Sequence, residues 1–145
     1  MTSHGNAFDF QLVSPERILF QGQATMVVLP ATSGLIGILA GHAPTIITLT
    51  KGIIDVYTNG DIAHRLFVGG GFANITETSC LTMADDAISV EDLMEADIEQ
   101  YIKEVETAIE NSIIEEEKEA LRRTAAIERS KLDTIERLQP AKKQI

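Results

Sequence analysis

The sequence predicts an α+β fold, in which an antiparallel β-sandwich or barrel is followed by an antiparallel hairpin of two helices. Residues 8–83 form short runs rich in Val, Ile, Thr and Phe, which Gly, Pro, Asn and Ser separate. From Ser89 onwards, apolar residues recur at steps of three and four, as they do on one face of an α-helix. This change of period divides the chain into two expected domains, residues 1–88 and residues 89–145.

Nine strands are expected in the first domain. Asn59-Gly60 is the strongest hairpin signal, because a type I′ turn needs positive φ at both of its central residues. Many short strands with no helical pattern between them favour an antiparallel sandwich or barrel over βαβ units. The expected strands cover residues 8–13, 18–20, 25–29, 35–39, 46–50, 53–57, 63–68, 72–76 and 80–83.

Two helices are expected in the second domain. Ser89-Val-Glu-Asp92 is a capping signature, in which the serine oxygen accepts a hydrogen bond from a free amide of the first turn. Asn111-Ser112 supplies a turn and a second cap, and Pro140 marks the end of a second helix over residues 112–138. The short break favours an antiparallel pair. The apolar positions expected on the helical stripes are Met94, Ile98, Tyr101, Ile102, Val105, Ala108 and Ile109, then Ile114, Leu121, Ala125, Leu132 and Ile135.

Charge is distributed unevenly along this hairpin. Residues 90–119 hold twelve acids and two bases, a net charge of −10, whereas residues 120–145 hold three acids and seven bases, a net charge of +4. The second helix is therefore the basic segment of the chain, and its apolar stripe is narrow and rich in alanine. Burial of so little apolar surface contributes little, at about 25 cal/mol per Å². We expect this helix to detach more easily than any element of the β domain.

Composition argues against several classes of protein. The overall net charge of −10 disfavours nucleic acid as a partner, because phosphate binding needs clustered Lys and Arg. The sequence has no run of 18 or more apolar residues, so no membrane-spanning helix is expected. Its first ten residues, MTSHGNAFDF, show no secretory signal. The single cysteine, Cys80, excludes an intrachain disulfide and fits a reducing compartment.

Residues with catalytic or metal-binding chemistry form no recognisable pattern. The histidines, His4, His42 and His64, lack the spacing of a metal site, and no Gly-x-Ser-x-Gly motif marks a nucleophile. Gly69-Gly-Gly71 precedes a strand pattern instead of a helix, so it is interpreted as a bend or bulge and not as a phosphate loop. We therefore expect no catalytic residue, no cofactor and no metal. The organisation favours a binding protein, with a β platform that carries a weakly held, charge-polarised helical arm.

Seven short motifs follow one another over residues 8–88 with ordinary spacing. They are Phe10-Gln-Leu-Val-Ser-Pro-Glu16, Phe20-x-Gly22, Val27-Val-Leu-Pro30, Gly37-Ile-Leu-x-Gly-His-Ala-Pro44, Leu49-x-x-Gly52, Gly69-Gly-Gly-Phe72 and Ala84-Asp-x-Ala-Ile88. Together they resemble the epsilon subunit of the F-type proton-translocating ATP synthase, whose mitochondrial counterpart is called delta. Over residues 89–138 the resemblance rests mainly on hairpin organisation and length.

The resemblance implies a non-catalytic subunit with an N-terminal β-sandwich of about ten strands and a C-terminal hairpin of two helices. The sandwich would join the gamma subunit to the membrane ring of c subunits, within the rotor that couples proton flow to ATP synthesis. In bacterial members the mobile arm can extend along gamma and oppose ATP hydrolysis by contacting the catalytic beta subunit. The complex would hold the chain peripherally at the cytoplasmic face of the bacterial inner membrane or, alternatively, at the matrix face of the mitochondrial inner membrane.

The resemblance also implies contact residues. The candidates for the c ring are Leu35, Gly41, His42 and Ala43. Toward beta, the candidates are the cations of the second helix, which would complement an acidic segment: Arg122, Arg123, Arg129, Lys131 and Arg137. The simpler interpretation of these cations is a solvated basic face. The competing function, from a different class, is a free-standing β-sandwich adaptor or small-ligand-binding protein whose hairpin recruits a partner helix.

Two departures limit what the resemblance implies. Some bacterial members bind ATP on the hairpin through the motif Ile/Leu-Asp-x-x-Arg-Ala, which corresponds here to Leu93-Met94-Glu95-Ala96-Asp97-Ile98. Asp97 places an acid where a cation would face phosphate, so we expect weak or no ATP binding. Relatives also often carry an acid in the ring-facing loop, where this chain has Thr32-Ser-Gly-Leu-Ile36. We therefore expect its ring contact to depend more on apolar packing and backbone hydrogen bonds.

Overall fold

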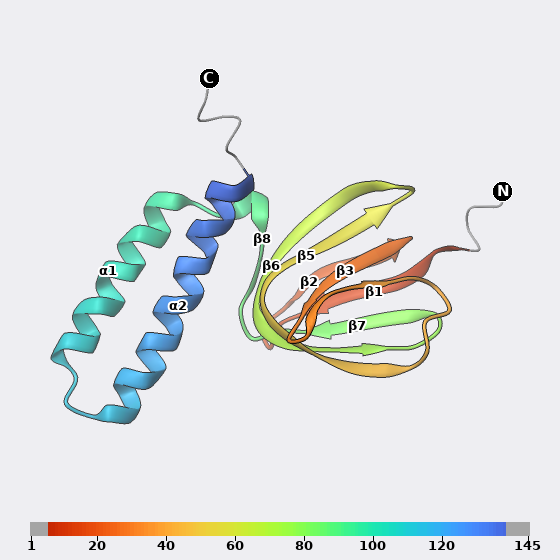
Figure 1. Cartoon of the computed structure of the whole chain (residues 1–145). Coiled ribbons are helices and arrows are strands. Elements are labelled where there is room, and N and C mark those ends of the chain that lie inside the picture. Colours follow the sequence, from red (N-terminus) through yellow and green to blue (C-terminus); the bar gives the residue numbers. More distant parts are fainter. Residues whose placement is uncertain (1–5, 139–145) are drawn as a thin grey trace, which may run out of the picture. The chain divides into compact units, whose positions relative to one another are not determined.

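The computed structural model describes residues 6–138. The chain divides into two compact units, and the boundary along the sequence lies between Glu91 and Asp92. The first unit contains all eight strands of the described chain, and the second contains the two α-helices (Figure 1). The expected division after Ile88 falls inside the last strand, which spans Ala87–Ser89. Neither helix of the described residues is long and apolar enough to cross a membrane.

The eight strands form one sheet that folds over a common core (Figure 1). Its order is β2-β1-β7-β6-β5-β3-β4, and β8 pairs with β6 beside this path. The predicted α+β class is confirmed. The strands are β1 (Phe8–Val13), β2 (Ile18–Ala24), β3 (Met26–Ala31), β4 (Gly34–Ile38), β5 (Thr45–Thr58), β6 (Asp61–Ile75), β7 (Ser79–Met83) and β8 (Ala87–Ser89).

The strands differ from the expected ones in two respects, the length of β5 and β6 and the direction of one pairing. Each runs through a glycine-containing stretch that the sequence suggested as a break, so four expected strands form two. β1 and β7 also run parallel, from Asp9 beside Ser79 to Val13 beside Met83, within an otherwise antiparallel sheet. Parallel neighbours need a long crossover. Here the intervening strands β2 to β6 supply it, which strand propensity alone does not reveal.

Buried and exposed side chains alternate along the strands, and the buried ones form the core of the sandwich. In β1, Phe8, Phe10 and Leu12 are buried, whereas Asp9 lies exposed between them, as the two-residue period requires. Side chains from β3, β4, β5, β6 and β7 join the same cluster, which includes Leu29. Each fully buried large apolar side chain contributes about 1.5–3 kcal/mol. The core is thus shared by strands that are far apart in the sequence.

Glycines place the sharp turns of this sheet. Asn59 and Gly60 have φ values of 53° and 91°, which confirms the hairpin predicted between β5 and β6. Gly70 and Gly71 have φ values of 115° and 141°, but the bend or bulge expected between two strands lies inside one continuous strand, which bends in Figure 1. The segment of β6 after this bend pairs with β7 and the segment before it pairs with β8. The bend therefore lets one strand serve two parts of the folded sheet.

The second unit is an antiparallel hairpin of α1 (Glu95–Asn111) and α2 (Glu115–Leu138), preceded by the 3-10 turn η2 (Val90–Asp92) (Figure 1). Ile98 and Ile102 of α1 pack with Ile135 of α2 in a small cluster that Leu93 and Leu132 border. Because Glu106 of α1 and Arg129 of α2 form an ion pair, the charged side of the seam is also bridged.

The first helix begins later than the capping signature predicts. Ser89 belongs to β8, and α1 starts only after Met94, whose side chain forms no capping hydrogen bond. Acidic residues in the first turn, Glu95 and Asp97, favour the helix dipole in place of the expected serine cap. The signature was misleading because a short strand and a 3-10 turn use these residues.

Three residues expected on the apolar stripes are exposed: Met94, Tyr101 and Ile114. Met94 and Ile114 precede their helices, so the helical period does not orient them. Tyr101 lies beside Ile102, about 100° around the helix from a stripe that is only wide enough for Ile98, Ile102 and Val105. The buried seam is thus narrower than the sequence pattern suggests.

Replacement of Gly71 by alanine should destabilise the sandwich strongly. A Cβ atom there would lie 2.1 Å from the carbonyl oxygen of Met83, and its φ of 141° is unfavourable for L-residues. We expect Gly71→Ala to lower the free energy of unfolding by about 2–5 kcal/mol in urea titrations. Gly37→Ala is the matched control: its nearest neighbour would be Met26 Sδ at 3.8 Å, and a change below about 1 kcal/mol is expected. A loss of stability in Gly71→Ala as small as that expected for Gly37→Ala would show that the bend tolerates a side chain.

The thiol of Cys80 should react only when the sandwich opens. Cys80 is 1% exposed, and desolvation raises its pKa although a hydrogen bond with Thr82 opposes the shift. Since the thiolate is the nucleophile, we expect a thiol-reactive disulfide at pH 8 to label the native chain more than about 100-fold more slowly than the urea-unfolded chain. Rapid labelling of the native chain would contradict the packing described here.

The same shift predicts a pH dependence of stability. The folded pKa of Cys80 lies above the unfolded value near 9.0, so its contribution is complete below pH 9 and is lost as the pH rises toward the folded pKa. Urea titrations between pH 8 and pH 10 should therefore show a loss of stability that is smaller in Cys80→Ala. An identical slope in both proteins would assign the loss to other groups.

Candidate interaction surfaces

Ionisable side chains of the described chain do not gather into a metal site. Between residues 6 and 138, no group of three or more His, Cys, Asp or Glu side chains could hold a metal ion. The ring of His64 packs against Phe20, with centroids 4.7 Å apart, and Nδ1 of His42 donates to the carbonyl oxygen of Ala43 at 2.8 Å. Both rings therefore have structural contacts, and the remaining candidates for function lie on the surfaces of the two units.

The loop between β4 and β5 holds three of the predicted ring-contact residues. Gly41 N–H donates to the carbonyl oxygen of Glu77 at 2.8 Å, and His42 N–H donates to that of Leu39 at 3.2 Å. Gly41 has a φ of 84°, which a glycine adopts without strain. Gly41 and Ala43 are exposed and His42 is half-buried. The loop is therefore accessible while its backbone is anchored to the β6–β7 turn.

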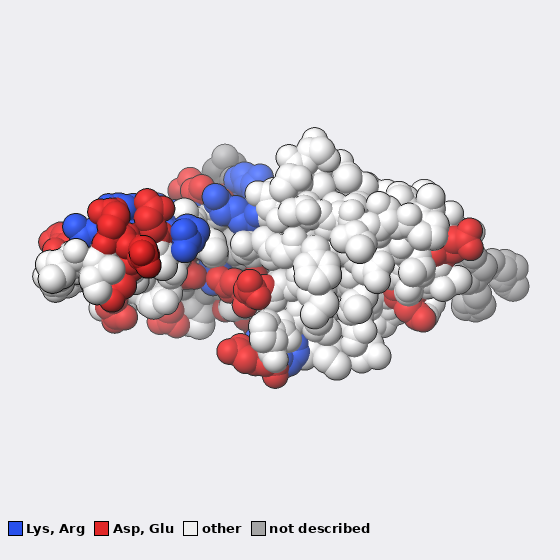
Figure 2. All heavy atoms as spheres, turned by 90° about the horizontal axis from the view of Figure 1, so that it is seen from below, with Lys and Arg blue, Asp and Glu red and all other residues white. Residues whose placement is uncertain are grey.

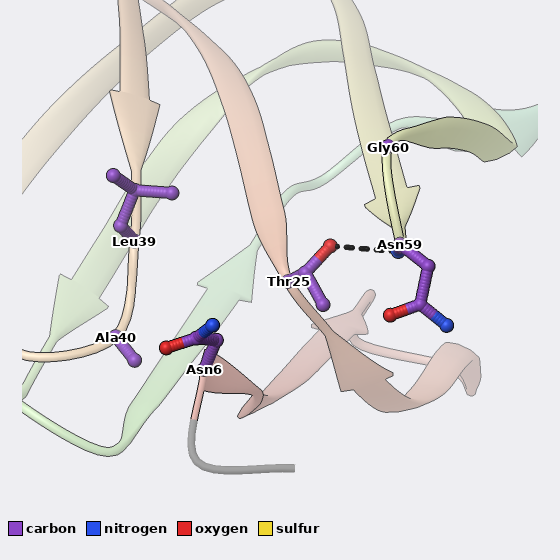
Figure 3. Close-up of a pocket in the computed structure, with 6 residues that line it drawn as sticks. All are labelled: Asn6, Thr25, Leu39, Ala40, Asn59 and Gly60. Atoms are coloured by element: carbon purple, nitrogen blue, oxygen red, sulfur yellow. Dashed lines mark hydrogen bonds between the residues drawn. The ribbon is translucent and has the colours of Figure 1, made fainter. Parts of the chain in front are cut away.

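A cavity of about 450 Å³ lies beside this loop (Figure 3). Thr25 Oγ1 accepts a hydrogen bond from Asn59 N–H at 3.0 Å and donates to the carbonyl oxygen of Tyr57 at 3.2 Å. These bonds fix the bend before β3 to the β5–β6 turn. The lining thus joins four segments of the chain: Asn6, Thr25, Leu39 with Ala40, and Asn59 with Gly60.

The fourth predicted ring-contact residue lies apart from this loop. Leu35 is near the start of β4, beside the turn at Thr32 and Ser33, and the loop follows the other end of the strand. Its side chain is 75% exposed, which is unusual for a leucine in a sheet. The structure therefore spreads the four residues along β4 and its following loop.

An uncharged stretch surrounds these residues. No Asp, Glu, Lys or Arg occurs between Arg17 and Lys51, although 23% of the chain is charged. These 33 residues (50 − 17) span β2, β3, β4 and the start of β5. Figure 2 shows a broad uncharged face on the sandwich, whereas charges crowd the hairpin. The sequence already contains this signal, but an absence of charge belongs to no motif.

A second apolar surface lies on the outside of β5, β6 and β7, and we call it the outer apolar face. Phe72 pairs directly with Met83 on one side and with Thr48 on the other. Ile46 lies two residues from Thr48, so it points to the same side of the sheet. The three large members, Ile46, Phe72 and Met83, are all exposed. Phe72 and Met83 thus form one cross-strand row with Thr48, and Ile46 lies one step along the same face; exposed apolar groups gathered in this way are typical of interaction surfaces.

The five predicted cations of α2 have different environments. Arg122 pairs with Glu115 at 3.1 Å and Glu119 at 3.4 Å, and Arg129 pairs with Glu106. Lys131 is 8% exposed and pairs with Glu128 at 2.8 Å. Three of the five are thus already engaged within the chain.

The other two cations, Arg123 and Arg137, are exposed. Within residues 6–138, neither of them forms an ion pair at 4.0 Å or less. They are consequently the members of the predicted set that are most available to a partner.

The tip of the hairpin carries an exposed apolar residue that the sequence analysis did not single out. Ser112 Oγ accepts from Ile114 N–H at 3.3 Å and donates to Glu117 Oε1 at 3.0 Å, which shapes the turn before α2. Ile113 is 96% exposed as a result. The available signal was two adjacent isoleucines directly after the predicted turn at Asn111-Ser112, because segments next to turns favour polar residues.

Comparison with known proteins agrees with this architecture. Residues 7–90 match the family described as ATP synthase, Delta/Epsilon chain, beta-sandwich domain. The ATP synthase epsilon chain of Rhodospirillum centenum is 39% identical over 138 residues, which cover 92% of this chain and 94% of that relative. That of Parvibaculum lavamentivorans is 39% identical over 130 residues, with 90% and 93% covered.

A solved structure shows the same fold. The chain matches one in the cryo-EM structure of Euglena gracilis mitochondrial ATP synthase, OSCP/F1/c-ring, with a TM-score of 0.70 and 21% identity, covering 88% of this chain and 81% of that one. The family match extends over the whole described sandwich, and the relatives also align over the hairpin. The resemblance inferred from the sequence motifs is thereby confirmed, and the chain belongs to the delta/epsilon family of ATP synthase subunits.

Proposed function

We propose that this chain is a non-catalytic rotor subunit of an ATP synthase, located peripherally at the cytoplasmic face of a bacterial inner membrane. The observation that carries the proposal is the pair of uncharged, partly apolar surfaces on a rigid sandwich of this family. A subunit that transmits torque needs two interfaces on one stiff body. The bacterial relatives named ATP synthase epsilon chain support the location.

The two surfaces of the sandwich suit different partners. The outer apolar face fits the gamma subunit, because a broad cross-strand row with Phe72 and Met83 can bury a large apolar area against another protein. The anchored loop with Gly41, His42 and Ala43, together with Leu35, fits the c ring. Its uncharged surroundings avoid the desolvation cost of burying charge.

The helical hairpin fits a regulatory role. Its seam depends on few apolar side chains, chiefly Ile98, Ile102 and Ile135, so its packing contributes only a few kcal/mol. A conformational change is accessible when its states differ by a few kcal/mol. Arg123 and Arg137 supply the unpaired positive charge that would contact an acidic segment of beta and oppose hydrolysis.

Removal of the hairpin should separate assembly from regulation. A chain that ends at Glu91 keeps β8 and its pairing with β6, so the sandwich should stay folded. When expressed with a tag in source membranes, the shortened and complete chains should both co-isolate gamma and c, and the shortened chain should increase ATP hydrolysis.

The outcomes distinguish the two parts of the proposal. Loss of gamma from the shortened chain would contradict the assignment of assembly to the sandwich. Failure of the complete chain to co-isolate gamma and c would contradict the rotor function itself.

Neutralisation of the two available arginines should weaken inhibition. Exposed ion pairs contribute about 0.2–1 kcal/mol each, so the double variant Arg123→Gln, Arg137→Gln should bind the catalytic part about two- to thirtyfold less tightly. We expect higher hydrolysis at low salt and a weaker dependence of inhibition on salt. The matched control is Arg122→Gln, because Arg122 already pairs with two glutamates. Equal effects of both variants would remove the distinction between paired and available cations.

A further inference from the structure

Asn59 is the one non-glycine residue of the described chain whose backbone has a positive φ. Gly60 follows it, and the φ values of 53° and 91° fit the two central residues of a type I′ turn. Both residue types adopt this left-handed conformation at low cost. Asparagine is also a thermolabile residue, and a glycine after it leaves its side chain least hindered. The turn therefore combines a favourable backbone with a reactive side chain.

The reaction open to this pair is deamidation by its own backbone. The nitrogen of Gly60, after loss of its proton to solvent, attacks Cγ of Asn59, and the side-chain amide nitrogen leaves as ammonia. The product is a cyclic succinimide. Water then adds to either carbonyl carbon and opens the ring, which leaves an aspartate or an isoaspartate in place of Asn59. The net change is the uptake of a water molecule and the release of ammonia, so no oxidant or cofactor is needed.

Solvent can reach both reacting groups. Asn59 and Gly60 are exposed, and within residues 6–138 no hydrogen bond occupies the side-chain amide of Asn59. Figure 3 shows this amide extending away from the bond between Asn59 N–H and Thr25. A Cβ atom at Gly60 would have no neighbour within 4 Å, so the space beside the attacking nitrogen is open. Burial therefore does not protect the pair.

The backbone of the turn keeps the reacting atoms apart. In a type I′ turn the first central residue has a ψ of about +30°, the mirror image of the type I value. At this ψ, Cβ of Asn59 and the nitrogen of Gly60 lie almost opposite each other about the Cα–C bond. The ring closes only when these two atoms are nearly eclipsed. The turn therefore has to open before the attack.

Thr25, which lies between β2 and β3, holds one side of this turn. Its Oγ1 accepts a hydrogen bond from Asn59 N–H at 3.0 Å and donates to the carbonyl oxygen of Tyr57 at 3.2 Å. Its backbone N–H donates to the same carbonyl oxygen at 2.9 Å. On the other side, Thr58 pairs with Asp61 across the hairpin. Because both sides are held, ψ of Asn59 cannot rotate until one of these contacts is released.

We propose that Asn59-Gly60 is a self-deamidation site whose reaction is controlled by Thr25. While the contact with Thr25 persists, the turn keeps its type I′ conformation and the amide of Asn59 is protected. When the turn opens, Asn59 is converted into aspartate or isoaspartate. The inference depends on this turn alone and not on the proposed rotor function.

The reaction would change the end of the β5–β6 hairpin. Either product adds a negative charge two residues from Asp61, and like charges at close range repel. Isoaspartate also places Cβ within the main chain, and this longer link no longer fits a two-residue turn. Because Asn59 and Gly60 line the same cavity as Leu39 and Ala40, the change reaches the loop after β4. Deamidation is thus a slow covalent modification with a defined structural consequence.

Mass spectrometry of peptides from the complete chain tests the site. During incubation at pH 8, the peptide that contains Asn59 should show the exchange of NH2 for OH at least about tenfold faster in the urea-unfolded chain than in the native chain. Asn74 is the internal control, because it is also exposed but the branched side chain of Ile75 hinders ring closure. Asn74 should stay unmodified over the period in which Asn59 reacts.

Two substitutions of Thr25 test its control of the reaction. Thr25→Val removes the hydroxyl group at nearly constant shape, and loss of its hydrogen bond should raise the rate at Asn59 in the native chain about two- to twelvefold. Thr25→Ser keeps the hydroxyl group and is the matched control, with a rate expected within about twofold of the original chain. In urea, where no turn is present, both variants should react at the original rate.

Every outcome of these measurements decides the proposal. Equal rates in the native and unfolded chains would show that the turn gives no protection, and an unreactive Asn59 in the unfolded chain would remove the site. Equal rates for Thr25→Val and Thr25→Ser would assign the protection to strand pairing instead of Thr25. Reaction of Asn74 as fast as that of Asn59 would show that the following glycine is not the cause of the reactivity.

Discussion

The bend at Gly69–Gly71 is the constraint on which the sandwich depends. A Cβ atom at Gly71 would lie 2.1 Å from the carbonyl oxygen of Met83, so no side chain fits there, and a Cβ atom at Gly52 of the paired strand would lie 2.9 Å from Cβ of Pro30. Because β6 is bent here, its half before the bend pairs with β8 and its half after the bend pairs with β7, and both halves contribute to a shared core. Straight strands of 14 and 15 residues would instead extend a flat sheet with one face in water.

This way of closing the core also determines the free surfaces. The outer apolar face forms where β5, β6 and β7 lie together after the bend, and the open edge at β4 exists because the sheet ends there. A closed barrel would have paired β4 with β2 and left no edge. The two surfaces proposed for gamma and for the ring thus arise from the same geometry. Their rigidity follows because both belong to strands that contribute to one core.

How much the sequence could predict varies with the range of the interactions. The turn at Asn59-Gly60 and the alternation of Phe8, Phe10 and Leu12 are local, and the prediction of both was confirmed. The parallel pairing of β1 with β7 joins residues about 70 positions apart, and no local pattern encodes it. The prediction of where α1 starts was wrong for a related reason. Ser89 pairs with Leu66 in β6, and this long-range contact overrides the capping preference of the serine.

For the candidate surfaces too, the local sequence predicted which residues are present, and long-range contacts determine which of them are available. The basic residues of α2 were visible in the sequence, but their availability was not, because Arg129 meets Glu106 only when the hairpin closes. The uncharged stretch between Arg17 and Lys51 was visible, yet its meaning depends on which residues reach the surface. Leu35 is exposed and Ile38 is buried in the same short strand, and both are equally apolar in the sequence.

The contrast between the two units is itself a physical argument for separate roles. Contacts made through apolar area and backbone hydrogen bonds vary little with ionic strength, whereas contacts made through exposed arginines weaken as salt screens them. A load-transmitting joint benefits from the first property, since torque has to pass under all ionic conditions. A regulator benefits from the second, because a contact of a few kcal/mol can be made and released. The described chain separates these properties, with an uncharged region on the sandwich and the available cations Arg123 and Arg137 on the hairpin.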